Sequence, residues 1–258
     1  SPGIEGGEAA ACSIIVTPDL VYYDTTRPSH LENLLNSDAF DLSKDQLART
    51  ESCIASIVRN RLSKFNHAPR INLRPRFPAD GTRRILLVDQ RKGGASIHWS
   101  LGGHATFERM LEAALAMPAC QILVKLHPEV IAGHARSHFR PLLPSPLPGN
   151  FVVIDYDVNP HDLFDVVDEV FVCTSQLGFE AVMAGKEVHC FAAPYYAGWG
   201  FTLDRLAIPR RSRPRTPAEV FHLYHIVHSR YFIPGKGAAE IEDLIQHLVT
   251  VRETPVPA

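Results

Sequence analysis

The sequence lacks the features that mark several large classes of protein. It has no CxxC pair, and its five cysteines are odd in number and widely spaced, which argues against a zinc or redox centre and a complete disulfide framework. No apolar run reaches the ~20 residues that a membrane-spanning helix needs, and no charged and then apolar leader opens the chain. The net charge is only −2, so no general positive field favours nucleic acid. We therefore expect a reduced, cytoplasmic protein whose membrane contact, if any, is peripheral.

What the sequence does contain is a regular alternation of strand and helix patterns. With 258 residues and 45% hydrophobic content, it can bury one large core or two modest ones. Apolar runs separated by helical spacing, as in Phe107, Met110 and Leu111, predict a parallel sheet covered by helices on both faces. The predicted strands are Ile85–Val88, Ile122–Leu126, Val152–Asp155, Glu169–Cys173 and Val188–Phe191.

The amino-terminal part has a different pattern. Ser13–Val16 and Leu20–Tyr23 alternate as a hairpin would, and capping-box patterns beginning at Ser29 and Ser43 predict two helices. At the other end, one helix begins after Thr216 and a second is expected over 238–251. We divide the chain into residues 1–70, a linker over 71–83, and a Rossmann-like domain over 84–258.

The segment 172–181 carries the strongest functional pattern. An apolar strand ends in Thr174, Ser175 and Gln176, and a helix follows. In parallel α/β sheets ligands bind beyond the carboxyl ends of the strands, where free N–H groups attract anions. Glu180, one turn further on, is placed to accept hydrogen bonds from a ribose diol. The alternative is a helix capped by Ser175 with Glu180 on a solvated face.

Two further strand ends carry polar groups. Lys125 and His127 come at the end of another predicted strand, where both can donate to a phosphate and an imidazole can protonate a leaving oxygen. The alternative is a structural His-Pro turn formed with Pro128. A third strand end runs over 88–97, where paired glycines allow a ligand to approach the backbone. Three loops therefore converge on one edge of the sheet.

Two segments near the carboxyl end remain ambiguous. The loop 194–201 combines aromatic residues such as Tyr196 and Trp199 with glycine, which suits stacking on a sugar or base and equally suits a buried aromatic turn. A run of arginines over 205–215 fits either an acidic glycan or lipid surface or a solvated loop.

Taken together, these segments resemble the retaining β-Kdo transferases of bacterial capsule assembly, which transfer 3-deoxy-manno-oct-2-ulosonic acid (Kdo) from its CMP-activated form. The similar elements are Lys-x-His-Pro at 125–128, Thr-Ser-Gln-x-Gly-Phe-Glu-Ala at 174–181 and Tyr-Ala-Gly-Trp-Gly at 196–200. The segments 21–29 and 62–66 are also similar to the family's. The resemblance implies a GT-B-like fold with a Rossmann-like carboxyl-terminal domain and a reduced amino-terminal lobe.

The resemblance also implies roles for individual residues. His127 and Lys125 would meet the CMP phosphate, Ser175 and Gln176 would complete the cradle, and Glu180 would hold the ribose. Sugar or acceptor contacts would come from Tyr196 and Trp199. No metal or other cofactor is then needed, because side-chain charge replaces a divalent cation. The full set of expected donor contacts is Lys125, His127, Pro128, Thr174, Ser175, Gln176, Gly178, Glu180, Gln90 and Ser96.

The chain departs from the family pattern in two places. Gly94 stands where the family carries an aspartate, the natural nucleophile for a retaining reaction in two displacements. Upstream, Ile4–Glu8 stands where most of a further lobe is expected. The expected function is therefore Kdo transfer to a glycan or glycolipid at the inner face of the bacterial inner membrane, with activity impaired at Gly94. The alternatives are a non-catalytic module that binds glycan or a partner transferase, and a transferase that uses CMP-sialic acid or a UDP-sugar.

Overall fold

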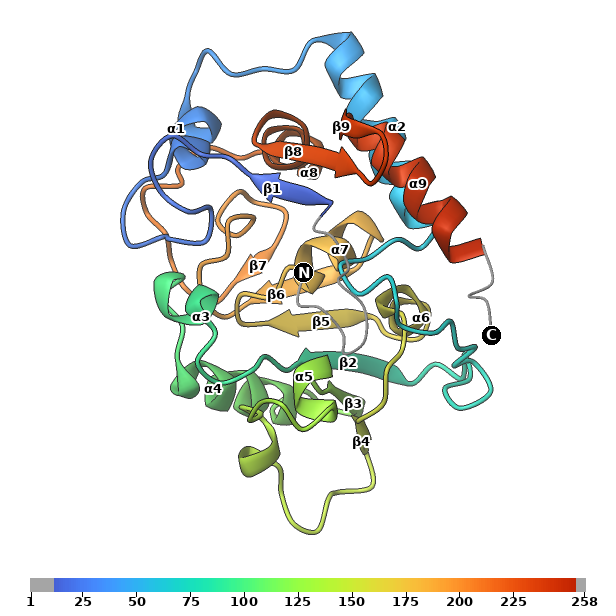
Figure 1. Cartoon of the computed structure of the whole chain (residues 1–258). Helices are drawn as coiled ribbons and strands as arrows, with labels where there is room; N and C mark the ends of the chain where they lie inside the picture. Colours follow the sequence, from blue (N-terminus) through green and yellow to red (C-terminus); the bar gives the residue numbers. More distant parts are fainter. Residues whose placement is uncertain (1–11, 254–258) are drawn as a thin grey trace.

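The computed structural model describes residues 12–253, which are built around a six-stranded parallel sheet. The strand order is β4-β3-β2-β5-β6-β7, and Figure 1 shows the sheet across the middle of the molecule. The predicted α/β fold with a parallel sheet is confirmed, and the five predicted strands are all present. The strands are β2 (Arg83–Val88), β3 (Cys120–Lys125), β4 (Phe151–Ile154), β5 (Glu169–Val172), β6 (Glu187–Cys190) and the short β7 (Leu203–Asp204).

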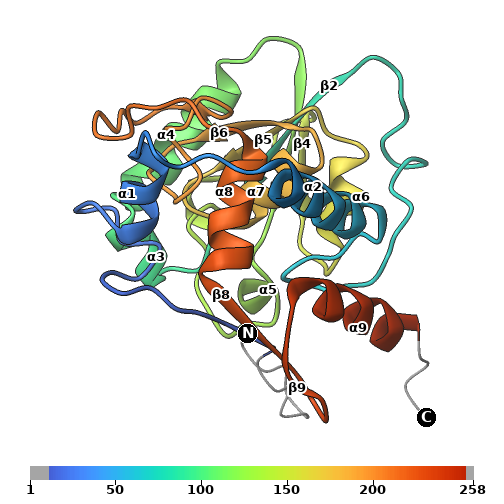
Figure 2. The same cartoon turned by 90° about the horizontal axis from the view of Figure 1, so that it is seen from above.

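Helices cover both faces of this sheet. The side chains of Ile85 to Val88 are at most 3% exposed, because a parallel sheet buries both faces of its central strands. Helix α4 (His104–Leu115) covers one face with Phe107 and Met110. The other face packs against helices α6 (Pro160–Phe164) and α7 (Leu177–Met183). Figure 2 shows the same layers from above. Short helices α3 (Ala95–Trp99) and α5 (Pro128–Ile131) follow the carboxyl ends of β2 and β3.

A second, antiparallel sheet of order β1-β8-β9 joins the two ends of the described chain. Its strands are β1 (Ser13–Ile15), β8 (Ser229–Ile233) and β9 (Gly237–Ala239). The predicted hairpin between 13–16 and 20–23 is therefore wrong: β1 pairs with β8, and residues 20–23 form a bend and a turn, not a strand. The alternating apolar residues there serve packing instead, since Tyr22 makes edge contacts with Tyr195 and Tyr224.

The predicted helix starts are mostly confirmed. Helix α1 (His30–Asn36) is capped by Ser29, and α2 (Lys44–Arg59) has the complete capping box of Ser43 and Gln46. Helix α8 (Pro217–Phe221) begins at Thr216 and continues into a π-helical turn over His222–Val227. The last helix, α9 (Ile241–Glu253), begins later than predicted, because residues 237–239 pair as β9.

Arg211 and Arg215 of the arginine run are built into the interior while Arg205 is exposed, so neither interpretation offered for the run holds in full. Arg211 is buried, and its Nε lies 3.0 Å from a carboxylate oxygen of buried Glu32, which also pairs with Arg210. Arg215 donates to Glu219 at 2.7 Å and to three backbone carbonyls around α1. A guanidinium has five donors, so it can hold several segments at once.

The amino-terminal helices share a core with the carboxyl-terminal part. Leu31, Leu35 and Cys53 belong to the same hydrophobic cluster as Val220 and Phe221. The division into residues 1–70, 71–83 and 84–258 stays a prediction, and Ile4–Glu8 lies outside the described residues. Among the described residues, no helix combines the length and apolar character needed to cross a membrane. As expected, Cys53, Cys120, Cys173 and Cys190 are buried free thiols.

Candidate functional site

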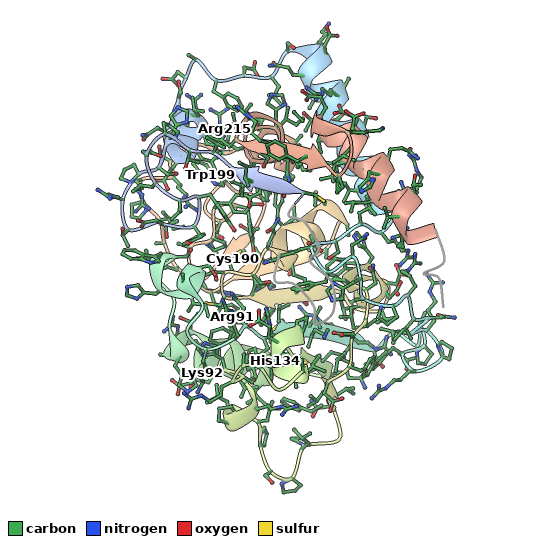
Figure 3. The ribbon with its side chains drawn as sticks, viewed as in Figure 1. Arg91, Lys92, His134, Cys190, Trp199 and Arg215 are labelled. Carbon is green, nitrogen blue, oxygen red and sulfur yellow. The ribbon has the colours of Figure 1, made fainter. Side chains whose placement is uncertain are left out.

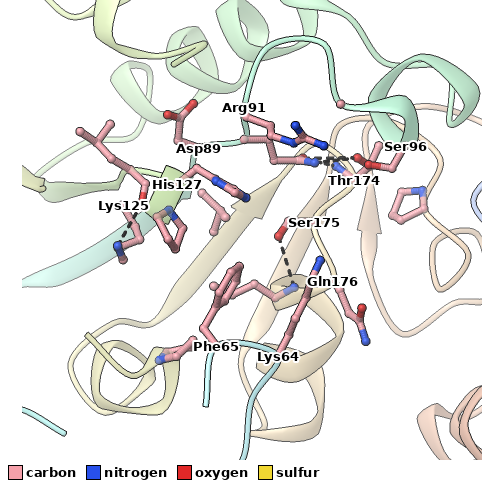
Figure 4. A pocket seen from close by; sticks show the side chains of 18 of the residues that line it. Lys64, Phe65, Asp89, Arg91, Ser96, Lys125, His127, Thr174, Ser175 and Gln176 are labelled. Atoms are coloured by element: carbon pink, nitrogen blue, oxygen red, sulfur yellow. Dashed lines mark hydrogen bonds between the residues drawn. The ribbon is translucent and has the colours of Figure 1, made fainter. Parts of the chain in front are cut away.

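The carboxyl ends of β2, β3 and β5 converge on a cavity of about 280 Å³, which we name the donor pocket after the ligand that the sequence predicts for it. This confirms that the three predicted loops lie together at one edge of the sheet, and Figure 4 shows their side chains. Its volume is near the lower end of the range for small-ligand sites, roughly 300–1,000 Å³. The predicted residues that line it are Gln90, Gly94, Ser96, Lys125, His127, Pro128, Thr174, Ser175 and Gln176.

His127 is presented to the pocket by the turn between β3 and α5. Its Nδ1 accepts the backbone N–H of Glu129 at 3.2 Å, so the ring caps α5, while Pro128 occupies the first helical turn. An accepting Nδ1 places the single proton of the neutral ring on Nε2. His127 is thus fixed as a hydrogen-bond donor.

Burial keeps this ring neutral. It lowers the pKa of His127 to about 4, and the nearby charges of Lys64 and Arg91 act in the same direction. Glu129 opposes them and also pairs with Arg91 across 3.4 Å. The surroundings are therefore positive around a neutral donor, an environment suited to an anionic ligand.

Lys125 lines the pocket but is turned toward the backbone. Its ammonium donates to the carbonyl oxygens of Leu126 at 2.9 Å and Tyr156 at 3.1 Å. Burial lowers the pKa of Lys125 to about 8, although nearby Asp157 and Asp155 oppose this effect. To contact a phosphate as predicted, the Lys125 ammonium would have to give up its hydrogen bond to one of these two carbonyl oxygens.

Gln90 joins the ends of the two central strands. Its Oε1 accepts from the N–H of Thr174 at 2.9 Å, and its Nε2 donates to the Thr174 hydroxyl at 3.0 Å. The Ser175 hydroxyl accepts from the N–H of Leu177, the first residue of α7, at 3.3 Å, whereas the N-cap residue itself is Gln176, which makes no side-chain capping bond. Gln90 and Ser175 therefore fix the shape of the pocket wall, while Gln176 and Ser96 lie along it.

Glu180 does not line the donor pocket. Its two carboxylate oxygens accept from the Ser63 hydroxyl at 2.7 Å and from the backbone N–H of Lys64 at 3.0 Å. It is only 5% exposed and borders a neighbouring cavity of about 730 Å³. The alternative of a solvated Glu180 is wrong, and its predicted contact with ribose stays a prediction.

The position of Gly94 is open. Gly94 has an ordinary φ of −64°, and an added Cβ would lie 3.4 Å from the carbonyl oxygen of Arg91, which is van der Waals contact. It is also the residue that caps α3, without a side-chain hydrogen bond. Asp89, five residues before Gly94, is the carboxylate of this strand end. Its side chain points away from Ser175 and Gln176, and its Oδ1 accepts the N–H groups of His138 and Phe139.

The aromatic loop is a core element, which corrects two predicted contacts. Tyr196 is fully buried and donates to the carbonyl of Ser175, and Trp199 is 1% exposed with its indole N–H on the carbonyl of Tyr195. Figure 3 shows Trp199 in the upper part of the molecule, with Arg91 and Lys92 below it in this view. Gly178 lies inside α7, where its missing Cβ makes room for Tyr196.

The pocket lining also contains residues that were not predicted, among them Tyr22, Lys64, Phe65 and Tyr195. Tyr22, Lys64 and Phe65 come from segments whose similarity to the family was noted, and Tyr195 directly precedes another such segment. The similarity to the family pointed to these segments, but their local sequence patterns do not indicate which side chains face the pocket.

One described cluster has the residue types of a metal site, at the opposite end of the sheet. Glu169, Glu187 and His189 begin β5 and β6, and His189 Nε2 lies 3.0 Å and 3.1 Å from the two carboxylates. However, Nδ1 of His189 accepts from Arg205 at 2.9 Å, which puts the ring proton on Nε2. A protonated Nε2 offers no lone pair to a metal, so the group is better explained as contacts of a neutral ring, whose pKa burial lowers, with the two carboxylates.

The chain is similar to proteins of bacterial capsule and lipopolysaccharide production. The family model described as capsule polysaccharide biosynthesis protein matches residues 51–232. The capsule polysaccharide modification protein LipA of Neisseria meningitidis serogroup A is 35% identical over 92% of this chain. The lipopolysaccharide-processing protein LpsZ of Rhizobium meliloti is 32% identical over 96% of it. The chain spans 35% of LipA and 56% of LpsZ.

Two solved domains share the fold. The β-Kdo 2,4 transferase of Thermosulfurimonas dismutans KpsC is 38% identical, with a TM-score of 0.86 over 94% of this chain and 74% of that one. The β-Kdo 2,7 transferase of the same protein is 27% identical, with a TM-score of 0.72 over 94% of this chain and 73% of that one. The residues that the family model matches, 51–232, include the ends of β2, β3 and β5 that form the donor pocket.

Proposed function

This chain belongs to the family of capsule polysaccharide biosynthesis proteins, and we propose that it is the donor-binding part of a glycosyltransferase that acts in capsule synthesis. The similar solved domains are named as β-Kdo transferases. We propose the same class of reaction here, with CMP-Kdo as donor and a glycan or glycolipid as acceptor. The single observation that carries the proposal is a neutral histidine donor in a positive pocket at the strand ends.

The chemistry of the donor fits this pocket. CMP is the leaving group, so negative charge builds up on its phosphate as the bond to the sugar breaks. A hydrogen bond from Nε2 of His127 to that oxygen would strengthen as the charge develops, which lowers the barrier. With the ring neutral at pH 7, His127 acts first as a donor, and a bound phosphate would raise the pKa of the ring toward that of a general acid.

The proposed reaction retains configuration through two displacements and needs no metal ion, because protein donors and cations receive the phosphate. The first displacement requires a carboxylate, and Gly94 stands at the position where we expect it. We propose that this substitution limits transfer by the chain as it stands. The proposed place of action is the cytoplasmic side of the inner membrane, reached by peripheral contact.

Calorimetric titration with CMP tests the proposal. We expect binding in the micromolar to millimolar range, and His127→Ala should weaken it about tenfold through loss of one hydrogen bond to a charged group. His134→Ala, a histidine outside the pocket lining, is the matched control. No CMP binding at millimolar concentration would sink the proposal, whereas displacement of CMP by UDP-sugars would redirect it to another donor.

A non-catalytic module is the second candidate, favoured specifically by Gly94. In that case the protein would bind anionic glycan or a partner transferase, and glycan binding would survive His127→Ala. Equilibrium binding of a Kdo-containing oligosaccharide to the parent and to His127→Ala separates the two candidates. Loss of glycan binding in the variant would exclude the second.

A further inference from the structure

The segment Ser63–Asn66, between α2 and the sheet, is held rigidly beside the donor pocket although no role has been assigned to it. Leu62, just before it, is 4% exposed, and its carbonyl oxygen lies 3.0 Å from Nε2 of His161. The Ser63 hydroxyl accepts the N–H of Phe65 at 3.1 Å, and the Phe65 ring packs edge-on against His127 with 6.0 Å between centroids. A segment fixed at these points presents its side chains in defined directions.

Glu180 is the main anchor of this segment. It binds the hydroxyl of one residue and the backbone N–H of the next, so a single buried carboxylate sets the position of the Lys64 main chain. Burial raises the pKa of Glu180, while the hydrogen bonds from Lys64 and Ser63 act in the opposite direction and favour the carboxylate form. Glu180, on α7, thus holds the segment Ser63–Asn66 at the rim of the pocket.

The Lys64 side chain is available to a ligand. It lines the donor pocket, its charge lowers the pKa of His127 after the larger effect of burial, and it forms no salt bridge with any described residue. Figure 4 shows it entering the pocket from one side, with Arg91 on the other and His127 on the wall between them. Arg91 is already paired with Glu129. Lys64 is therefore a pocket-lining cation without a salt-bridge partner among the described residues, although its charge is felt by buried Glu180 and its ammonium lies 5.9 Å from the centroid of the Phe65 ring.

We propose that Lys64 binds the second negative group of the donor, the carboxylate of the activated sugar acid, and that Glu180 is the positioning residue that holds Lys64 in place. This inference rests on the proposed function. A CMP-activated sugar acid carries one charge on its phosphate and one on its carboxylate, close to the anomeric carbon. His127 faces the first charge, and Lys64, on a different element, faces the second. The same arrangement selects against donors whose sugar is neutral.

Titrating both CMP and CMP-Kdo into the full chain tests the inference. Lys64→Ala should weaken CMP-Kdo about tenfold and CMP by less than about twofold, since only CMP-Kdo has the carboxylate. Lys236→Ala, an exposed lysine in the turn between β8 and β9, should change neither. An equal loss for both ligands would make Lys64 a phosphate contact and overturn the inference, as would no loss for either. If the parent chain binds neither ligand, the proposed function itself fails.

Variants of the anchor separate positioning from ribose binding. Glu180→Gln keeps the shape of the side chain but loses its charge, and should weaken CMP-Kdo severalfold while CMP binding holds. Ser63→Ala removes one of the two bonds to Glu180 without touching the core, and should act in the same direction. A loss of CMP affinity in Glu180→Gln with no effect of Ser63→Ala would assign Glu180 to the ribose and overturn its positioning role.

Discussion

Replacing Gly94 with aspartate should both stabilise the protein and raise its transfer activity. The new Cβ fits, since its nearest neighbours would be the Arg91 carbonyl at 3.4 Å and the Ile97 side chain at 3.6 Å. An aspartate would supply the side-chain cap that α3 lacks, worth a few tenths of a kcal/mol relative to glycine. Removing a glycine from the unfolded chain adds about 0.4–1 kcal/mol. The sum is roughly 1 kcal/mol, or a Tm about 2–4 °C higher for a chain of this size.

The effect on transfer should be much larger than the effect on stability. A carboxylate at this position lies in the donor pocket, where it can attack the anomeric carbon. We expect transfer from CMP-Kdo to rise on the order of 10²-fold or more, because loss of a nucleophile typically costs several powers of ten. Gly94→Asn is the matched control: it caps the helix equally well but cannot form the covalent intermediate. Equal rates for the two variants, or full activity of the unmodified chain, would refute the assignment.

Two further predictions concern stability. Burial lowers the pKa of His138 to about 4, so the unfolded chain binds more protons below pH ~6.5 and the folded state loses stability as the pH falls from 6.5 toward 4. His138→Phe keeps a ring stacked on Phe107 and should remove this part of the pH dependence of the free energy of unfolding, which is at most about 1.4 kcal/mol per pH unit. Urea titrations at several pH values measure it. The same pH dependence in both proteins would contradict the prediction. Gly178→Ala places a Cβ 2.3 Å from the Tyr196 hydroxyl and should cost about 1–3 kcal/mol, whereas Gly149→Ala meets nothing within 4 Å. Equal urea midpoints for these two alanine variants would show that α7 shifts freely.

The regular part of the fold could be predicted from the sequence because its patterns are local. The strand runs, and the serines that begin α1 and α2, each report on a single element. The pairing of β1 with β8 depends on residues far apart in the chain, so Ser13–Val16 looked like half of a local hairpin. Similarly, β9 is too short to interrupt a helical pattern by itself.

The site was predictable at the level of loops and less so at the level of side chains. A strand end fixes where His127 lies, so its place in the pocket followed from the sequence. The direction of a long side chain depends on its partners, and those of Lys125 and Glu180 come from other segments. Aromatic residues beside glycine suit a ligand or a core equally, and only packing shows that Tyr196 belongs to the core.

The closure of the fold by its two ends has a consequence for folding. The small sheet joins β1 to β8, and Nδ1 of His30 lies 2.9 Å from Nε2 of His228 although the two residues are 198 positions apart in the sequence. Contacts across so long a loop form late, because the entropy of closing the loop is lost before the contacts can compensate. The parallel sheet should therefore assemble first and the amino-terminal strand should dock last. Amides of β1 should accordingly exchange with solvent sooner than those of β2, and the rim of the donor pocket built on Tyr22 should be the final part of the site to form.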